Sequence, residues 1–215
     1  MRERMKRSVL FVVATACLTL PRDATAVGGA SQEHDQSFFM RTSVGICAGN
    51  ARDEGPGYQV KLENPGLDVN IAAGYTVIPN LAVHATLWGW GLNDPDTHIT
   101  SATGGVTLPN HGILQMIAFG GGATYFVMPI NAYLSSSIGF GGFSGTDELD
   151  GQSAHGLAVD VTAGKEWWVN DEWGAGAALS YSHVTADDNS LGPKGVPSGT
   201  WTGTSWALRF TATFN

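Results

Sequence analysis

The sequence has few charged residues, only two cysteines and no long apolar run after its first 20 residues. Charged residues make up 14% of the 215-residue chain, whereas about 25% is usual for a soluble domain. Beyond residue 26, single polar residues interrupt the apolar ones, which excludes a membrane helix of about 20 apolar residues. Scattered apolar residues in a chain with 29 glycines are typical of β-barrel strands, which alternate apolar and polar side chains.

The first 26 residues have the three regions of a secretory signal peptide. Residues 1–7 are basic, Ser8–Leu20 is apolar, and Ala24-Thr25-Ala26 offers small residues for cleavage. The alternative, a single-pass anchor, requires a longer apolar segment of about 20 residues. A lipoprotein site at Cys17 is disfavoured, because Ala14 stands where a larger aliphatic residue is expected. We therefore expect cleavage near Ala26.

Cleavage there changes the charge and the cysteine content. It removes five of the 11 basic residues and two of the 19 acidic ones, which leaves a net charge of −11. Nucleic acid is thereby excluded as a partner, because phosphate binding needs a basic surface. Only Cys47 remains, which excludes an intrachain disulfide and cysteine-rich metal or redox motifs.

Beyond a small, polar segment at 27–37, which we expect to be a flexible leader, the sequence predicts one β-barrel domain over 38–215. Its hydrophobic period is two, as expected of strands with one apolar face. We expect eight strands, at 38–48, 67–77, 81–92, 113–127, 132–143, 157–169, 173–183 and 200–214. Most reach the roughly 9–11 residues with which a tilted strand crosses a bilayer.

The predicted connections alternate in length. Tight turns are expected at 78–80, 128–131 and 170–172, and long polar loops at 51–66, 93–112, 144–156 and 184–199. Short turns at one end and long loops at the other are typical of bacterial outer-membrane barrels. We therefore expect short periplasmic turns and longer extracellular loops.

Aromatic residues recur beside the expected turns. Such rings are expected to form a girdle at the membrane interface, where amphipathic side chains meet the headgroups. The girdle would comprise Tyr75, Tyr125, Tyr133, Trp167 and Trp173. The alternative is that these are core aromatics of a soluble, lipocalin-like barrel, whose apolar faces would point inward.

The last strand has the alternation of an outer-membrane assembly signal. Trp206, Leu208, Phe210 and Phe214 share one apolar face, although Asn215 follows the last aromatic residue. With its strand number, loop asymmetry and glycine-rich strands, the mature chain resembles the small eight-stranded outer-membrane barrels of the OmpX, OmpA-transmembrane and OmpW type. No residue signature selects a subfamily.

That resemblance implies an all-β, antiparallel up-and-down transmembrane barrel in the cell outer membrane of a Gram-negative bacterium. The expected partners are outer-membrane lipids, lipopolysaccharide and the outer-membrane assembly machinery, with the protein itself a monomer. Proteins of this architecture differ widely in activity, so the architecture alone does not select a function.

If the apolar faces meet lipid, a polar set must point into the barrel. This lumenal network is expected to comprise Arg41, Asp68, His84, Asp160, Glu166 and Arg209. An eight-stranded barrel is just wide enough for side chains to fill it, so Arg41 and Arg209 are expected to face Glu166 and Asp160. Such a network predicts a plugged barrel; the alternative is a narrow or gated pore. Lys165 falls on the lipid face near the interface, where it can snorkel.

We expect no catalytic residue, cofactor or metal site. Acidic residues of the long loops could hold Ca²⁺ or Mg²⁺, but none matches a calcium-binding motif. Ser180 and Ser182 share a face, whereas the adjacent His183 points to the other side, so they do not form a nucleophile–base pair. The sequence favours a non-enzymatic barrel that acts through acidic loops or a plugged lumen. The alternatives are a narrow porin-like channel for small solutes and a lipid-modifying enzyme.

Overall fold

A computed structural model describes residues 34, 38–55, 57–146, 153–187 and 200–214. The chain divides into two units, Met1–Ala30 and Ser31–Asn215, and the second contains all of these residues. The expected signal peptide and most of the expected leader therefore lie outside the described residues. No helix in the described part is long and apolar enough to cross a membrane.

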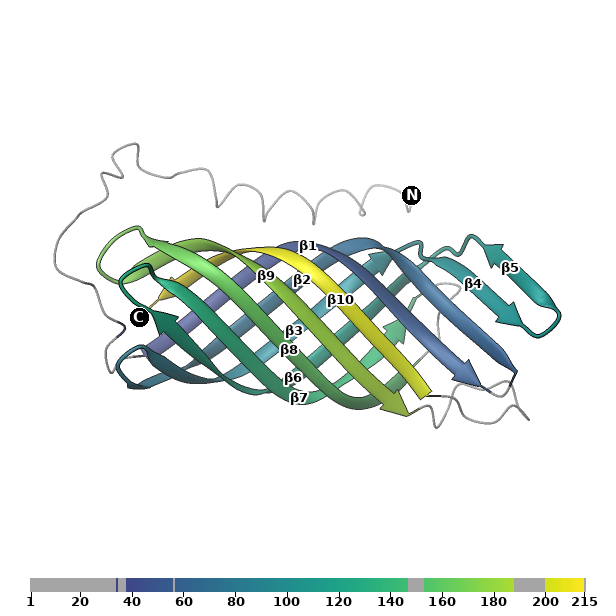
Figure 1. The fold of residues 1–215 in the computed structure, drawn as a ribbon, viewed down its shortest axis with the longest axis horizontal. Helices are drawn as coiled ribbons and strands as arrows, with labels where there is room; N and C mark the ends of the chain where they lie inside the picture. Colours follow the sequence, from purple (N-terminus) through teal and green to yellow (C-terminus); the bar gives the residue numbers. More distant parts are fainter. Residues whose placement is uncertain (1–33, 35–37, 56, 147–152, 188–199, 215) are drawn as a thin grey trace, which may run out of the picture. The chain divides into compact units, whose positions relative to one another are not determined.

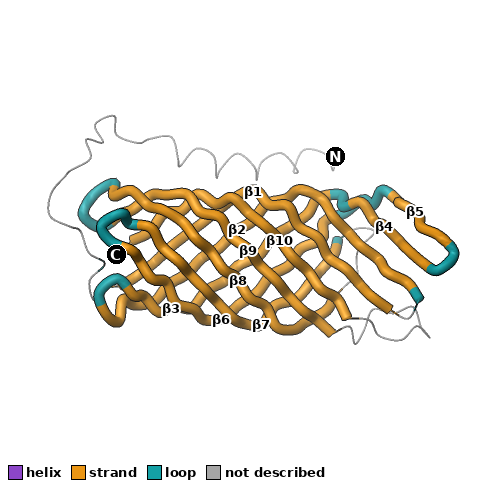
Figure 2. The backbone as a smooth tube through the Cα atoms, in the orientation of Figure 1, coloured by secondary structure: helices purple, strands orange, loops and turns teal. Residues whose placement is uncertain are grey.

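Every regular element of the described residues is a β-strand. The strands are β1 (Phe38–Gly55), β2 (Tyr58–Ile78), β3 (Leu81–Asn93), β4 (Asp96–Ser101), β5 (Gly104–Leu108), β6 (Ile113–Val127), β7 (Ala132–Gly145), β8 (Ser153–Trp168), β9 (Trp173–Asp187) and β10 (Thr200–Phe214). Eight of them follow one another around a closed antiparallel barrel, and β1 closes the ring by pairing with both β2 and β10. Figures 1 and 2 show these strands tilted around the barrel axis. The predicted eight-stranded antiparallel barrel is confirmed.

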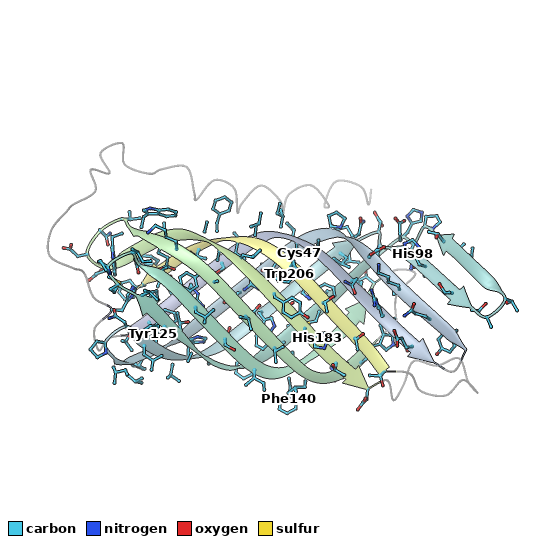
Figure 3. The ribbon with its side chains drawn as sticks, in the orientation of Figure 1. Cys47, His98, Tyr125, Phe140, His183 and Trp206 are labelled. Carbon is cyan, nitrogen blue, oxygen red and sulfur yellow. The ribbon has the colours of Figure 1, made fainter. Side chains whose placement is uncertain are left out.

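The alternation of the sequence determines which side chains face out. Ile46, Phe140 and Phe210 project from the outer surface with 67%, 78% and 76% of their area exposed. Figure 3 shows Phe140 pointing away from the barrel. Charged residues such as Arg209 are buried inside. This is the reverse of a soluble lipocalin-like barrel, which would place its apolar faces inward.

Three tight turns lie at one end of the barrel, which we call the turn end. Pro79 and Asn80 join β2 to β3, residues 128–131 join β6 to β7, and residues 169–172 join β8 to β9. Asn80 and Asn131 have φ values of 67° and 49°, a left-handed conformation that asparagine tolerates better than most residues. Asn170 accepts hydrogen bonds from the backbone N–H groups of Glu172 and Trp173, which closes the third turn.

The expectation of a long loop at 51–66 is wrong. β1 runs on to Gly55, β2 begins at Tyr58, and the two strands are paired up to these residues. The inward side chains Ala51 and Leu62 are buried there, so the apolar face of the pair continues although its outer face is polar. The expected loop at 93–112 contains β4 and β5, a hairpin that pairs with β2 outside the ring and that we call the tongue. Parts of the other two expected loops, 147–152 and 188–199, lie outside the described residues.

Candidate functional site

The guanidinium of Arg209 lies near the middle of the lumen between two carboxylates. Asp68 of β2 accepts from its Nε and Nη2, the latter at 3.0 Å, and Asp160 of β8 accepts from Nη2 at 2.9 Å. Nη1 also donates to Thr162 Oγ1 at 2.9 Å. β10 carries the arginine, and β2 and β8 each lie two strands away from it around the ring. These four residues, which we call the ionic layer, link opposite sides of the barrel wall.

A second polar group lies between the ionic layer and the turn end. Arg41 donates to Ser135 Oγ at 2.9 Å, and its guanidinium lies 4.6 Å from the ring centroid of Tyr133. Ser135 also accepts from Thr124, which is 3.1 Å from Nε2 of His84. These hydrogen bonds connect β1, β3, β6 and β7 across the lumen.

The six residues expected in the lumenal network are all buried inside the barrel. Arg209 pairs with Asp160, as the sequence predicts, and additionally with Asp68. The hydrogen bond of Arg41 goes to Ser135 and not to one of the expected carboxylates, Glu166 and Asp160. Glu166 instead accepts from Thr213 Oγ1 at 2.5 Å and from Thr211 Oγ1 at 3.4 Å.

Four of the five residues expected in the aromatic girdle lie on the outer surface near the turn end, namely Tyr75, Tyr125, Trp167 and Trp173. The placement of Tyr133 is wrong: its ring is 3% exposed and lies inside, beneath Arg41. β7 leaves its turn with Tyr133 on the inward face, and the next residue, Leu134, takes the outward position with 56% exposed. Of the expected assembly signal, Trp206, Leu208 and Phe210 face outward, and Phe214 contacts the rings of Phe38 and Trp173.

His34, within the segment expected to be a flexible leader, lies fully buried at the turn end. Its ring stacks on Phe126 at a centroid distance of 3.5 Å, and its Nε2 is 3.0 Å from Asn131 Oδ1. The backbone N–H of His34 donates to Asn80 Oδ1, and the backbone carbonyl of His34 accepts from the backbone N–H of Asn80. His34 therefore joins the β2–β3 turn to the β6–β7 turn at this end. No periodicity in the sequence indicates this contact.

The half of the lumen toward the tongue is mainly apolar, although Asp53 also points inward there, whereas barrel interiors are usually polar. Phe143 lies between Trp90 and Trp201, with a centroid distance of 6.0 Å to each. The group also contains Trp88, Leu92, Leu114 and Met116, and all seven, which we call the aromatic layer, are at most 7% exposed.

Sequence reasoning missed the aromatic layer, although a signal exists. Within 81–92 the large apolar residues change from odd positions, such as Leu87, to even positions from Trp88 onward. The intervening Gly89 and Gly91 then occupy the outward positions. This change of face indicates an apolar interior from Trp88 onward, in contrast to the expectation of a polar lumen.

The apolar inner face continues from the aromatic layer onto the tongue. Leu62 belongs to the same buried cluster, and Val60 packs against it. Val60 pairs with Ile99 of β4, which in turn pairs with Val106 of β5, so these side chains share one face of the sheet. Val106 is 49% exposed. An apolar surface thus extends from the interior of the barrel to the exposed hairpin.

Two arrangements of polar side chains bear on the expectations for metal binding and for a Ser–His pair. The described residues contain no group of three or more His, Cys, Asp or Glu side chains arranged to hold a metal ion. Ser182 points inward and is 2% exposed, whereas His183 points outward and contacts Thr185, so the two face opposite sides. Several acidic residues of the expected loops, at 147–150 and 188, lie outside the described residues.

The fold is similar to that of known outer-membrane barrels. The crystal structure of the outer membrane protein OprG from Pseudomonas aeruginosa matches with a TM-score of 0.52 and 12% identity, over 86% of this chain and 98% of that chain. Neisserial surface protein A (NspA) matches with a TM-score of 0.51 and 11% identity, over 82% of this chain and 97% of that chain. Both share the architecture predicted from the sequence, and at these identities the likeness shows the fold alone. No protein-family model and no curated protein matches the sequence.

Proposed function

We propose that this chain is a non-enzymatic outer-membrane barrel whose lumen is closed by its own side chains and which acts through its tongue end. The filled lumen carries this proposal. The ionic layer and the aromatic layer both consist of side chains that are at most 7% exposed. A barrel of eight strands has an interior only just wide enough for side chains, so a water-filled path would require both layers to move.

The outer surface supports the membrane location. Large apolar side chains with 37–78% of their area exposed cover this surface, and a soluble barrel would not leave so much apolar area in water around its whole circumference. Lys165, the outward cation of β8, bends back so that its Nζ donates to the carbonyl of Ile130 and lies 5.5 Å from the Trp167 ring. That is how a lysine near an interface avoids hydrocarbon.

Two measurements on the same preparation test this proposal. Membrane fractionation with a heat-dependent gel shift should place the folded chain in the outer membrane. Planar-bilayer recordings of the purified protein should then show no steady ion conductance. A chain recovered from the soluble periplasm would contradict the membrane location, and a stable open channel would contradict the closed lumen.

A second candidate function is the capture of small apolar solutes at the tongue end. The continuous apolar surface from Val106 and Ile99 to the aromatic layer favours it. Two outer grooves also flank β6 beside this layer, one lined by Trp90 and Gly91 and the other by Gly142 and Phe143. A solute could contact apolar side chains along the inner face of the hairpin toward the lumen, and in the grooves on the outer wall of the barrel.

Two neighbouring residues of β5 provide a matched test of solute capture. Val106 lies on the apolar inner face of the tongue, and Thr107 lies on the opposite face beside His98. Val106→Asp should weaken binding of an apolar naphthylamine fluorophore about tenfold or more, because a charge would interrupt the apolar surface. Thr107→Asp should leave binding unchanged. Equal binding by both variants would contradict this candidate.

A further inference from the structure

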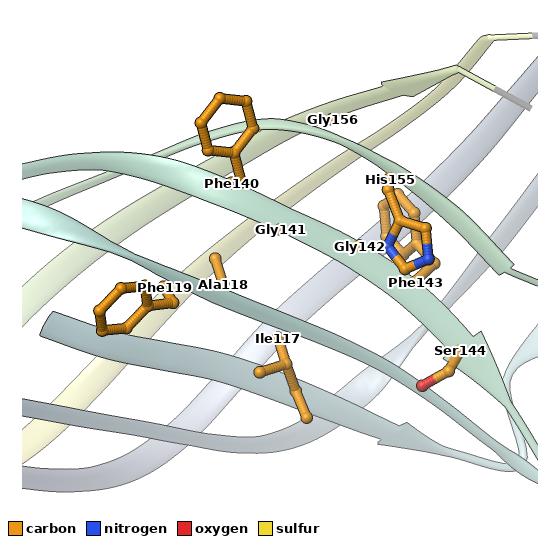
Figure 4. Close-up of a pocket in the computed structure, with 10 residues that line it drawn as sticks. All are labelled: Ile117, Ala118, Phe119, Phe140, Gly141, Gly142, Phe143, Ser144, His155 and Gly156. Carbon is orange, nitrogen blue, oxygen red and sulfur yellow. The ribbon is translucent and has the colours of Figure 1, made fainter.

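A groove of about 630 Å³ crosses β6, β7 and β8 on the outer face of the barrel. Its floor lies where Gly142 stands between Ile117 and His155, its register partners on the two neighbouring strands. Phe119 and Phe140, which are 64% and 78% exposed, line the groove one step further toward the turn end. Figure 4 shows the His155 imidazole beside Gly142. The groove therefore has apolar walls, and one polar group, the His155 ring, lies over Gly142 at one end.

Gly142 makes room for the His155 ring at the end of the groove. A Cβ added at this position would collide with Nδ1 of His155 and with the carbonyl oxygen of Ala154. The histidine ring can therefore lie over the glycine only because no side chain is present there. The volume is within the roughly 300–1,000 Å³ of ordinary ligand sites.

Groups of both polarities stand at the polar end: His155 lines the groove, and Asp187 stands next to it just outside the lining. His155 and Asp187 are register partners on β8 and β9, both exposed, and both on the outer face. Directly opposite side chains of an antiparallel pair lie about 4.5–5.5 Å apart at Cβ. The imidazole can donate a hydrogen bond to a phosphate oxygen, and the carboxylate can accept from an ammonium group. Toward the turn end, the next outward side chains on β7 and β8, Phe140 and Leu157, are apolar.

We propose that this groove binds one zwitterionic phospholipid, with an acyl chain along Ile117, Phe119 and Phe140, its phosphate on His155 and its ammonium on Asp187. The charges select this occupant. An anionic lipid without an ammonium group would place its phosphate beside Asp187 with nothing to offset the repulsion. The inference goes beyond the closed-lumen function and rests only on the membrane location proposed above.

Native mass spectrometry of the purified protein tests the site. After removal of co-purified lipid, the protein is incubated with phosphatidylethanolamine or with phosphatidylglycerol of the same acyl chains. We expect one phosphatidylethanolamine to be retained, with an affinity about three- to tenfold above that for phosphatidylglycerol, as one additional charged contact would supply. Equal retention of the two lipids, or preferential retention of lipid A, would overturn the assignment.

Two tryptophan substitutions separate the site from general lipid contact. Ile117→Trp should fill the groove and abolish the retained lipid. Ile138→Trp adds the same ring to an outward position of the neighbouring strand β7 that does not line the groove, and this variant should retain the lipid. Asp187→Asn should remove the preference for phosphatidylethanolamine, and His155→Ala should weaken both lipids. Equal lipid retention by the Ile117 and Ile138 variants would show non-specific annular lipid only and would refute the proposal. A normal heat-dependent gel shift of each variant shows that the barrel has folded, so failure of the site is distinct from failure of the membrane location.

Discussion

Arg209 of β10 and Asp68 of β2 are bound to each other inside the barrel although β1 lies between their strands. They are 141 residues apart in the sequence, and their contact spans the seam at which the barrel closes. The pair therefore stabilises the closed ring itself, in addition to the backbone ladders of β1 with β2 and β10. Asp160 adds a second carboxylate from the other side, so one guanidinium contacts two buried carboxylates.

Removal of the Arg209 charge should strongly destabilise the barrel. Arg209→Met keeps an apolar stem but leaves Asp68 and Asp160 without their cation, which typically costs about 3–5 kcal/mol for a buried pair. Urea unfolding in lipid vesicles measures the change in the free energy of unfolding. Arg52→Met, at an exposed position of β1, is the control and should change it by less than about 0.5 kcal/mol. Similar stabilities of the two variants would contradict a structural role of the ionic layer.

The contacts of His34 should tie the segment before β1 to the turn end. His34→Ala removes a stacked ring and a buried side-chain hydrogen bond, which together contribute about 1–3 kcal/mol. The same unfolding assay measures the loss. His98→Ala removes a half-exposed ring of the tongue and should have a smaller effect. If the two substitutions cost the same, the docking of His34 does not stabilise the barrel.

The orientation of β8 predicts a depth-dependent cost for a charge on its outer face. Val161 faces outward about midway between Leu157 and Lys165. A lysine near the bilayer midplane costs about 2–4 kcal/mol, whereas one near the interface costs about 0–1 kcal/mol. Val161→Lys should therefore destabilise the protein in vesicles far more than Lys165→Ala does. If Val161→Lys hardly changed the free energy of unfolding, this face of β8 would be in contact with water and not with lipid.

The strands could be predicted from the sequence because the period-two pattern persists through each membrane-crossing segment. Expected and observed strands share their limits at 113–127 and 200–214, and the others differ mainly at the end away from the tight turns. There the outer face becomes polar where strands leave the apolar band. The pattern then loses its contrast, although Ala51 and Leu62 still face inward. The same loss of contrast hides the hairpin of the tongue.

The candidate site was predictable only where charge marked the inner face. Buried charges in a barrel have few alternatives to the lumen, so Arg209 and Asp160 could be placed from alternation alone. Tyr133 and Trp88 could not, because an amphipathic or apolar ring fits either a girdle or a filled interior. Only the register that follows a turn decides between them. His34 depends on a tertiary contact across the turn end, which no local pattern of the sequence encodes.

Trp90 and Trp206 should differ sharply when each is replaced by alanine. Trp90 is 3% exposed inside the aromatic layer and packs against Phe143, so Trp90→Ala should leave a cavity and cost about 3–5 kcal/mol. Trp206 is 56% exposed on the outer face beside Tyr181, where lipid can take the place of the lost ring, so Trp206→Ala should cost much less. Unfolding in lipid vesicles measures both, and the heat-dependent gel shift checks that each variant folds. An aromatic layer that filled the lumen only loosely would instead give two similar, small losses, and the closed lumen would then have to rest on the ionic layer alone.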